Sequence, residues 1–158
     1  FHRMRLFRLL DKSQARRLIW ITAPAGAGKT TLVASYLKSK RVPVLWYRLD
    51  ESDADPSSFF SFLSVAARSL APRFKRPLPV LTPEYALGLQ TFARRYFQAL
   101  GARLPRRCRI VLDNYQDIPA QAGLHQLLAC GVYELPDGIS VVVMSRQGPC
   151  SPMARLLA

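Results

Sequence analysis

The sequence predicts an α/β fold with a mostly parallel sheet and helices on both faces. Short apolar runs rich in β-branched residues alternate with longer segments of helical spacing along the 158 residues. Parallel neighbours need crossover connections, which are usually helical, so this alternation favours a three-layer α/β/α arrangement. Three of the apolar runs also lead directly into chemically distinctive residues, which would place these residues at one edge of the sheet. The length corresponds to one domain.

Strands are expected at 18–22, 44–49, 109–113 and 139–144. A short helix over 4–10 precedes the first strand, so residues 1–16 are expected to lead into a core formed by 17–158. Sheets of this kind usually have a fifth strand. We therefore expect this chain, which begins at Phe1 rather than Met, to be a fragment that stops before that strand.

The other helices are expected after residue 31, from Asp55–Pro56, from Thr82–Pro83 and over 121–133. Asp55 and Pro56 combine an N-cap acid with a proline at the first helical position. The helix that starts near Thr82 carries a buried stripe, and Gly101 and Pro105 are expected to mark its end. The stripe consists of Tyr85, Leu89, Phe92, Tyr96 and Leu100.

A phosphate-binding loop is predicted between the first strand and the helix after it. Successive backbone N–H groups and the positive end of a helix dipole converge at such a junction. Lys29 can reach the β- and γ-phosphates, and the Thr30 hydroxyl can ligate Mg²⁺. Ala23 stands where the GxxxxGK[S/T] pattern has glycine. The predicted loop residues are Ala23, Pro24, Ala25, Gly26, Ala27, Gly28, Lys29, Thr30 and Thr31.

The third strand ends in a carboxylate, Asp113, as a Walker B strand does. Taken alone, this run could be an ordinary buried strand with an Asp that caps the next turn, but beside a phosphate-binding loop it predicts a magnesium ligand. The next residue is Asn114, where related ATPases often have a second acid that activates water. An amide cannot accept that proton, so we expect firm nucleotide binding with slow hydrolysis.

Four separated segments resemble the STAND-type P-loop ATPase domain of the MalT-like, large LuxR-type bacterial transcription regulators. They are Ala23–Leu32, Val44–Glu51 with its acidic turn, Asp113–Gln116 and Val141–Arg146. In the family the third segment usually reads Asp-Asp-Tyr-His, so Asn114 and Gln116 depart from it. The likeness runs from about residue 3 to 155.

The resemblance implies a nucleotide-gated switch, in which ADP holds a resting form and ATP with an inducer permits self-association and transcription activation. It assigns Lys29, Asp113 and Arg146 to the catalytic centre, with Arg146 sensing the γ-phosphate. From sequence alone, Arg146 could equally pair with a nearby carboxylate. The implied cofactors are ATP or ADP and Mg²⁺. The implied partners are other domains of the same regulator, with DNA bound only through those domains.

Two classes of function remain open at this stage. One is an ATP-hydrolysing switch, and the other is a binding module in which the nucleotide gates partner contact without hydrolysis. A small-molecule kinase is a third reading, although no acceptor-binding motif stands out.

The net charge of +13 comes mostly from arginines scattered over expected helix faces and loops. This distribution is typical of a solvated surface, with a polyanionic partner as the alternative. Cys108, Cys130 and Cys150 form no Cys-x-x-Cys pair, and neither histidine lies in a ligand pattern. No apolar run reaches the length of a membrane helix, and no signal peptide is present. We therefore expect a cytoplasmic protein without a cysteine-based metal site.

Overall fold

The computed structural model describes residues 2–72 and 75–157, so residues 1, 73, 74 and 158 of the predicted domain lie outside the described part. Its strands are β1 (Leu18–Thr22), β2 (Val44–Arg48), β3 (Arg109–Asp113) and β4 (Ser140–Ser145). Its α-helices are α1 (His2–Lys12), α2 (Lys29–Lys40), α3 (Pro56–Arg68), α4 (Leu89–Arg103), α5 (Leu124–Val132) and α6 (Ser151–Leu157). Short 3₁₀ turns lie at η1 (Glu51–Ala54), η2 (Pro83–Tyr85) and η3 (Tyr115–Asp117).

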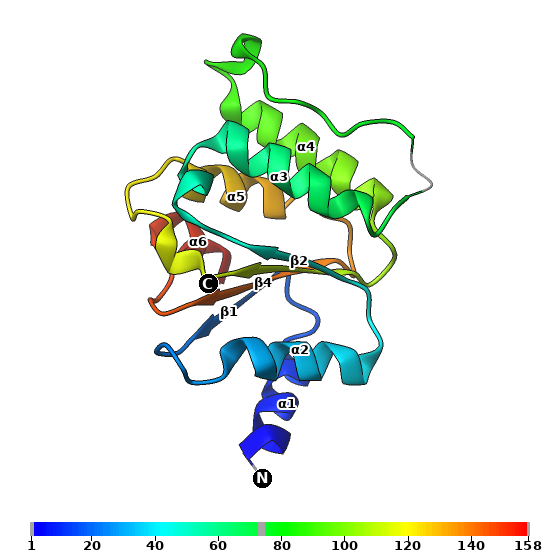
Figure 1. Cartoon of the computed structure of the whole chain (residues 1–158), viewed down its shortest axis with the longest axis vertical. Helices are drawn as coiled ribbons and strands as arrows, with labels where there is room; N and C mark the ends of the chain where they lie inside the picture. The colour runs from blue at the N-terminus through cyan, green and yellow to red at the C-terminus, as the bar shows by residue number, and fades with distance from the viewer. Residues whose placement is uncertain (1, 73–74, 158) are drawn as a thin grey trace.

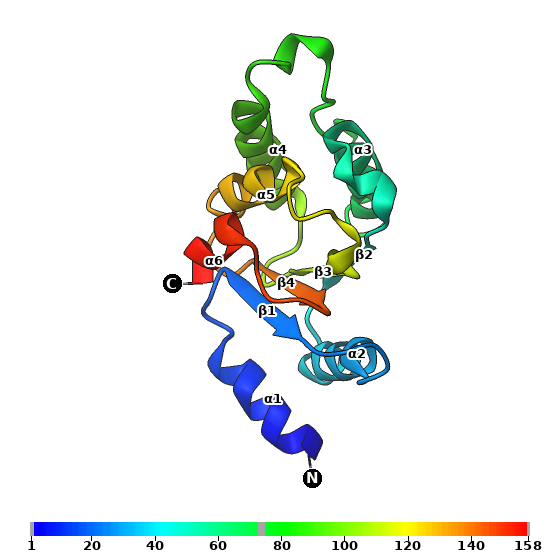
Figure 2. The ribbon, with the colours of Figure 1, turned by 90° about the vertical axis from the view of Figure 1, so that its left-hand side faces the viewer.

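The four strands form one parallel sheet in the order β1-β4-β3-β2, which confirms the predicted fold class (Figure 1). Helices α1 and α2 lie on one face, and α3, α4 and α5 lie on the other (Figures 1 and 2). The last strand in sequence, β4, is inserted between β1 and β3. The carboxyl ends of β1 and β3 are therefore separated by the width of a single strand.

Each strand sends alternate side chains to the two faces, as the pleat requires. Ile110 and Val141 belong to the core under α3, α4 and α5, whereas Val111 and Val142 pack with α2. All six residues of β4 are buried, as expected for an interior strand covered on both faces. The two cores hold the helix layers against opposite sides of the sheet.

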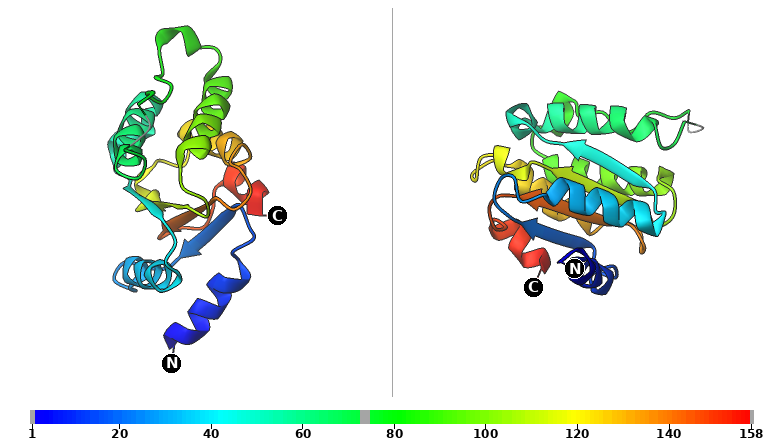
Figure 3. Two further views of the ribbon diagram at one scale, coloured as in Figure 1. Left: turned by 90° about the vertical axis from the view of Figure 1, so that its right-hand side faces the viewer. Right: turned by 60° about the horizontal axis from the view of Figure 1, so that its bottom comes forward.

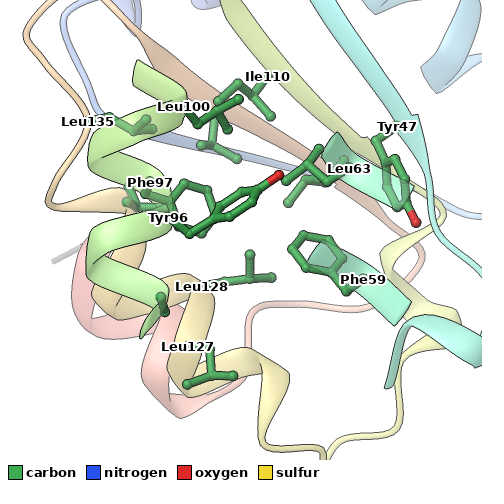
Figure 4. Close-up of a cluster of buried hydrophobic side chains, with 14 of the residues drawn as sticks. Tyr47, Phe59, Leu63, Tyr96, Phe97, Leu100, Ile110, Leu127, Leu128 and Leu135 are labelled. Carbon is green, nitrogen blue, oxygen red and sulfur yellow. The ribbon is translucent and has the colours of Figure 1, made fainter. Parts of the chain in front are cut away.

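The larger core is rich in aromatic side chains that pack edge to face. The Phe60 ring lies 5.0 Å from Phe92 and 4.7 Å from Tyr96, which connects α3 to α4. Figure 4 shows Tyr96 and Phe97 from α4 directed into the space between α3, α5 and the sheet. The Tyr96 hydroxyl is hydrogen-bonded to Ser64 at 2.8 Å, so its polar end is satisfied inside the core.

The helix predicted from Thr82 begins later in the structure. Pro83 to Tyr85 form a 3₁₀ turn, and α4 starts after Gly88, whose φ and ψ of −133° and 39° break the helical path. Tyr85 nevertheless reaches the expected stripe, because its ring lies 5.0 Å from Phe92. The prediction that Gly101 ends the helix is wrong. A Cβ at this position would lie 2.5 Å from Cδ of Pro136, so this glycine permits close packing instead.

The other boundaries differ by a few residues, and one helix was not predicted. Helix α5 begins at Leu124 rather than 121, and β4 extends to Ser145. Helix α6 packs beside α5 and buries Met153 (Figure 3). Among the helices of the described ranges, none combines the length and apolar character needed to cross a bilayer.

The contact between α4 and α5 depends on Gly131. A Cβ built there would lie 2.1 Å from Cδ2 of Phe97, whose ring is buried. We expect Gly131→Ala to lower the free energy of unfolding by about 1–3 kcal/mol, because a well-packed core resists added volume. Urea denaturation measures this change. Gly123→Ala is the matched control, since no atom lies within 4 Å of a Cβ at that position. Equal effects of the two substitutions would contradict this packing argument.

Candidate phosphate-binding site

The predicted loop leaves β1 at the carboxyl edge of the sheet and folds into an open turn. Gly26 and Gly28 adopt left-handed φ values of 79° and 81°, which favour glycine. No atom lies within 4 Å of a Cβ at either position, so the space beside both glycines is free. The Ala27 N–H donates to the Pro24 carbonyl at 3.2 Å and closes the turn. Residues 24–28 are all exposed.

Helix α2 presents its amino end to this turn. Its N-cap is Gly28, which has no side chain to accept hydrogen bonds from the first-turn N–H groups. Those groups and the helix dipole favour an anion at this position. The helix is anchored from behind by buried Val33, Tyr36 and Leu37, so its amino end is held at a fixed place relative to the sheet.

The Lys29 ammonium lies over its own loop. It donates to the carbonyls of Ala23 and Pro24, the second at 3.2 Å. A bound phosphate would replace these neutral acceptors with anionic ones, which attract the ammonium more strongly. Lys29 therefore lies beside the proposed phosphate position, and a phosphate could replace its hydrogen bonds to the two carbonyls.

The structure brings Thr30 and Asp113 together across 83 residues of sequence. The Thr30 hydroxyl donates to Oδ2 of Asp113 at 3.3 Å, from the first turn of α2 to the last residue of β3. One hydroxyl and one carboxylate suit Mg²⁺, which takes few protein ligands and fills its octahedron with water and substrate phosphates. The described residues contain no cluster of three or more His, Cys, Asp or Glu that could hold a metal. Magnesium here would depend on the phosphates of its nucleotide.

Asn114 is held by contacts with the end of β2 and with the turn after β3. Its backbone is left-handed, with φ 66° and ψ 36°, a conformation that Asn tolerates. Its Nδ2 donates to the Leu49 carbonyl at 3.3 Å and to Oδ2 of Asp117 at 2.7 Å. Its Oδ1 accepts from Gln116. Asn114 thus fastens the end of β2 to the turn after β3, a role that sequence alone did not reveal.

The end of β4 lies beside the loop. The Ala23 N–H donates to the Ser145 carbonyl at 3.2 Å, which continues the β1–β4 pairing by one residue. The backbone N–H of Arg146 donates to Oε1 of Gln116 at 3.1 Å. Arg146 therefore lies at the predicted edge with an exposed side chain, and its hydrogen bond to the neighbouring turn is made by the backbone. Gln116 links that turn to β4.

A buried polar chain lies behind the turn after β3. The Tyr115 hydroxyl lies 2.7 Å from Nδ1 of His125, and Nε2 of His125 lies 2.7 Å from the Pro119 carbonyl. A carbonyl only accepts, so Nε2 carries the proton and Nδ1 accepts from Tyr115. Burial raises the pKa of Tyr115 far above its ordinary value, which keeps the phenol neutral. The Tyr115 ring also packs against Trp20 of β1 at 5.2 Å.

The acidic turn after β2 caps helices, as expected. The Asp50 carboxylate accepts from the Ser52 N–H at 2.8 Å, and Asp53 accepts in return from the Asp50 N–H at 2.9 Å. Hydrogen bonds from the Ser52 hydroxyl and amide lower the pKa of Asp50. Asp55 caps α3 by accepting from the Ser58 N–H at 3.3 Å. These carboxylates accept hydrogen bonds from backbone N–H groups, and the turn lies at the carboxyl edge of the sheet.

Comparison with known proteins matches this arrangement to a described family. Residues 2–146 fit the family model Nephrocystin 3, N-terminal, and the match therefore includes every residue of the predicted site. The chain belongs to this family. The Nephrocystin 3, N-terminal match ends at Arg146, directly after β4.

The resemblance to MalT-like regulators is also confirmed. The chain is 32% identical to the HTH-type transcriptional regulator MalT of Cronobacter sakazakii, over 98% of this chain and 17% of that protein. It is 30% identical to MalT of Vibrio cholerae, over 93% of this chain and 16% of the relative, and 31% identical to MalT of Serratia proteamaculans, over 98% and 17%. The chain spans about one sixth of the length of these relatives.

The contacts of Asn114 predict the outcome of restoring an acid at that position. In Asn114→Asp, the new carboxylate would face the Leu49 carbonyl and Asp117 where Nδ2 now donates to both. We expect a loss of about 1–3 kcal/mol in the free energy of unfolding at pH 7, since two acceptors are left without their donor. The loss should shrink at low pH, because a protonated carboxyl at residue 114 regains a hydrogen-bond donor. Urea denaturation at pH 7 and pH 4 checks this. A variant as stable as the parent at pH 7 would contradict the assigned contacts.

Proposed function

We propose that this domain binds a magnesium–nucleotide complex, ATP or ADP, as the switch module of a multidomain transcription regulator. One observation carries the proposal: the Thr30 hydroxyl and the Asp113 carboxylate lie 3.3 Å apart beside a glycine turn and the uncapped amino end of α2. The turn supplies N–H donors for phosphates, Lys29 supplies a cation, and the Thr30–Asp113 pair supplies magnesium ligands. When bound, the metal would neutralise charge between the phosphates and Asp113.

The regulator part of the proposal comes from the relatives. Each is named an HTH-type transcriptional regulator, and each is about six times longer than the matched region. The proposed partners are therefore other domains of the same polypeptide, with self-association as the output. DNA is contacted through those domains, and the proposed location is the cytoplasm.

Slow hydrolysis is proposed because Asn114 cannot act as a base. Its amide has no proton-accepting nitrogen, and its Nδ2 donates to the Leu49 carbonyl and to Asp117. Loss of a general base commonly lowers the rate by about 10²–10⁴-fold. The same contacts favour a second candidate, a non-hydrolysing module in which the nucleotide gates partner contact.

Loss of the Lys29 ammonium is expected to remove nucleotide binding without unfolding the domain. ATP with Mg²⁺ at about 100 times its Kd should stabilise the parent chain by roughly 2.7 kcal/mol. Lys29→Ala should gain almost nothing, and its stability without nucleotide should match the parent, because Lys29 contacts only its own exposed loop among the described contacts. Chemical denaturation with and without MgATP measures both quantities.

Lys38→Ala is the matched control, since Lys38 lies near the other end of the same helix and carries the same charge. It should keep the full stabilisation by MgATP. An equal gain in Lys29→Ala and the parent would refute the site.

Hydrolysis is tested by a single turnover with γ-labelled ATP and excess protein. We expect labelled ATP to persist over many minutes in the parent and to be hydrolysed faster in Asn114→Asp, because a carboxylate can accept the proton that the amide cannot. Equal rates in the two chains would show that the identity of residue 114 does not limit hydrolysis. Label transferred to an added metabolite would instead indicate a small-molecule kinase.

A further inference from the structure

A cavity of about 580 Å³ lies outside the phosphate-binding site, between α3, the second half of α4 and the segment that joins them. Figure 1 shows this segment crossing back over the two helices after α3 ends. The cavity is lined along α3 from Ser57 to Arg68, and Leu100 and Leu104 close it from α4. Its volume lies within the range of roughly 300–1,000 Å³ that is typical of small-molecule sites.

The floor of the cavity is apolar. Phe60, Leu78 and Leu100 line it and are almost fully buried. Val65 and Val80 also line it, yet they are 58% and 70% exposed. The apolar surface therefore continues from the core to the opening, where it remains in contact with water. An aliphatic or aromatic group placed here would remove that surface from water.

Every charged residue among the described lining is a cation. The four are Arg68, Lys75, Arg76 and Arg103. Arg103 is engaged with the Pro77 carbonyl, and Arg68, Lys75 and Arg76 are the other three cations of the lining. Cations gathered around one opening without a lining carboxylate raise the local positive potential, and an anion would lower it.

The joining segment is held over the cavity by a specific contact. Nη2 of Arg103 donates to the Pro77 carbonyl at 2.9 Å, and the neighbouring Leu78 side chain is buried against the core. This contact fixes the wall that carries Lys75 and Arg76 relative to α4. On the opposite wall, the exposed Ser61 side chain adds a hydroxyl to the lining from α3.

We propose that this cavity binds an amphipathic organic anion, with an aliphatic body over Val65 and Val80 and a carboxylate head among Arg68, Lys75 and Arg76. The apolar floor explains the need for a hydrocarbon body, and the all-cationic rim explains the need for a negative head. Neither the apolar floor nor the cationic rim alone would indicate an amphipathic anion. The site shares no residue with the phosphate-binding loop, so the inference does not rest on the proposed nucleotide function.

Decanoate is the probe, and its binding to the 158-residue chain is measured by calorimetry and by displacement of anilinonaphthalene sulfonate fluorescence. We expect saturable binding of decanoate and at least about tenfold weaker binding of decanol, which lacks the charge. Arg68→Gln/Arg76→Gln should weaken decanoate roughly tenfold. The control Arg5→Gln/Arg8→Gln removes the same charge from exposed positions on α1 and should bind as the parent does.

Ser61→Trp fills the cavity from an exposed position and should abolish binding of both decanoate and decanol. Circular dichroism melts establish that each variant is folded. If Ser61→Trp unfolds, the decanoate affinity of Arg68→Gln/Arg76→Gln still tests the proposal. Lys29→Ala should bind decanoate normally. Equal binding of decanol and decanoate, or unchanged affinity in Arg68→Gln/Arg76→Gln, would overturn the proposal.

Discussion

The insertion of β4 between β1 and β3, with all strands parallel, is the constraint on which the rest of the molecule depends. It places the carboxyl ends of β1, β4 and β3 side by side at one edge of the sheet. Pairing continues beyond the strands, where the Ala23 N–H donates to Ser145 and the Leu49 N–H donates to Asp113. The loops that carry Lys29 and Arg146 thus begin from backbone that the sheet already holds. This pairing brings Thr30 within hydrogen-bond distance of Asp113.

At this edge, the groups suited to nucleotide binding are separate from the residue expected to take part in hydrolysis. The groups suited to phosphate and metal come from the loop, the first turn of α2 and the end of β3. The residue that follows β3 turns its side chain back toward β2, because a left-handed backbone at Asn114 allows Nδ2 to reach Leu49. Under the proposed function, such a domain would bind its nucleotide with little hydrolysis, and its partners would sense occupancy rather than turnover.

Much of the fold could be predicted from sequence because local signals agree with the tertiary arrangement. The uninterrupted apolar run of β4, which is buried on both faces, and the glycine turn before α2 are readable from residue types alone. The order of the strands could not be predicted, since any right-handed crossover could have placed β4 elsewhere. Gly101 was misread because a glycine that ends a helix and one that admits Pro136 look identical in a sequence.

The residues of the candidate site could be predicted from the sequence, but the directions of their side chains could not. Lys29, Thr30 and Asp113 are recognisable by spacing and by the strands before them. The roles of Asn114 and Gln116 depend on where their side chains turn, which only the Leu49, Asp117 and Arg146 contacts reveal. One wall of the cavity beside α3 is tied to α4 by the Arg103–Pro77 contact, which joins the end of a helix to a proline-rich segment 26 positions earlier that has no regular pattern.

The distribution of charge follows from the same parallel architecture. Helices that return between parallel strands end at the edge opposite the phosphate-binding loop, and α2, α3 and α4 each carry cations in their last turn. Cations there complement the negative ends of the helix dipoles. Acidic side chains lie instead at the loop edge, among them Asp50, Asp113 and Asp117. A triphosphate approaching Asp113 would meet repulsion that a divalent cation removes, so nucleotide and magnesium would bind there as one unit under the proposed function.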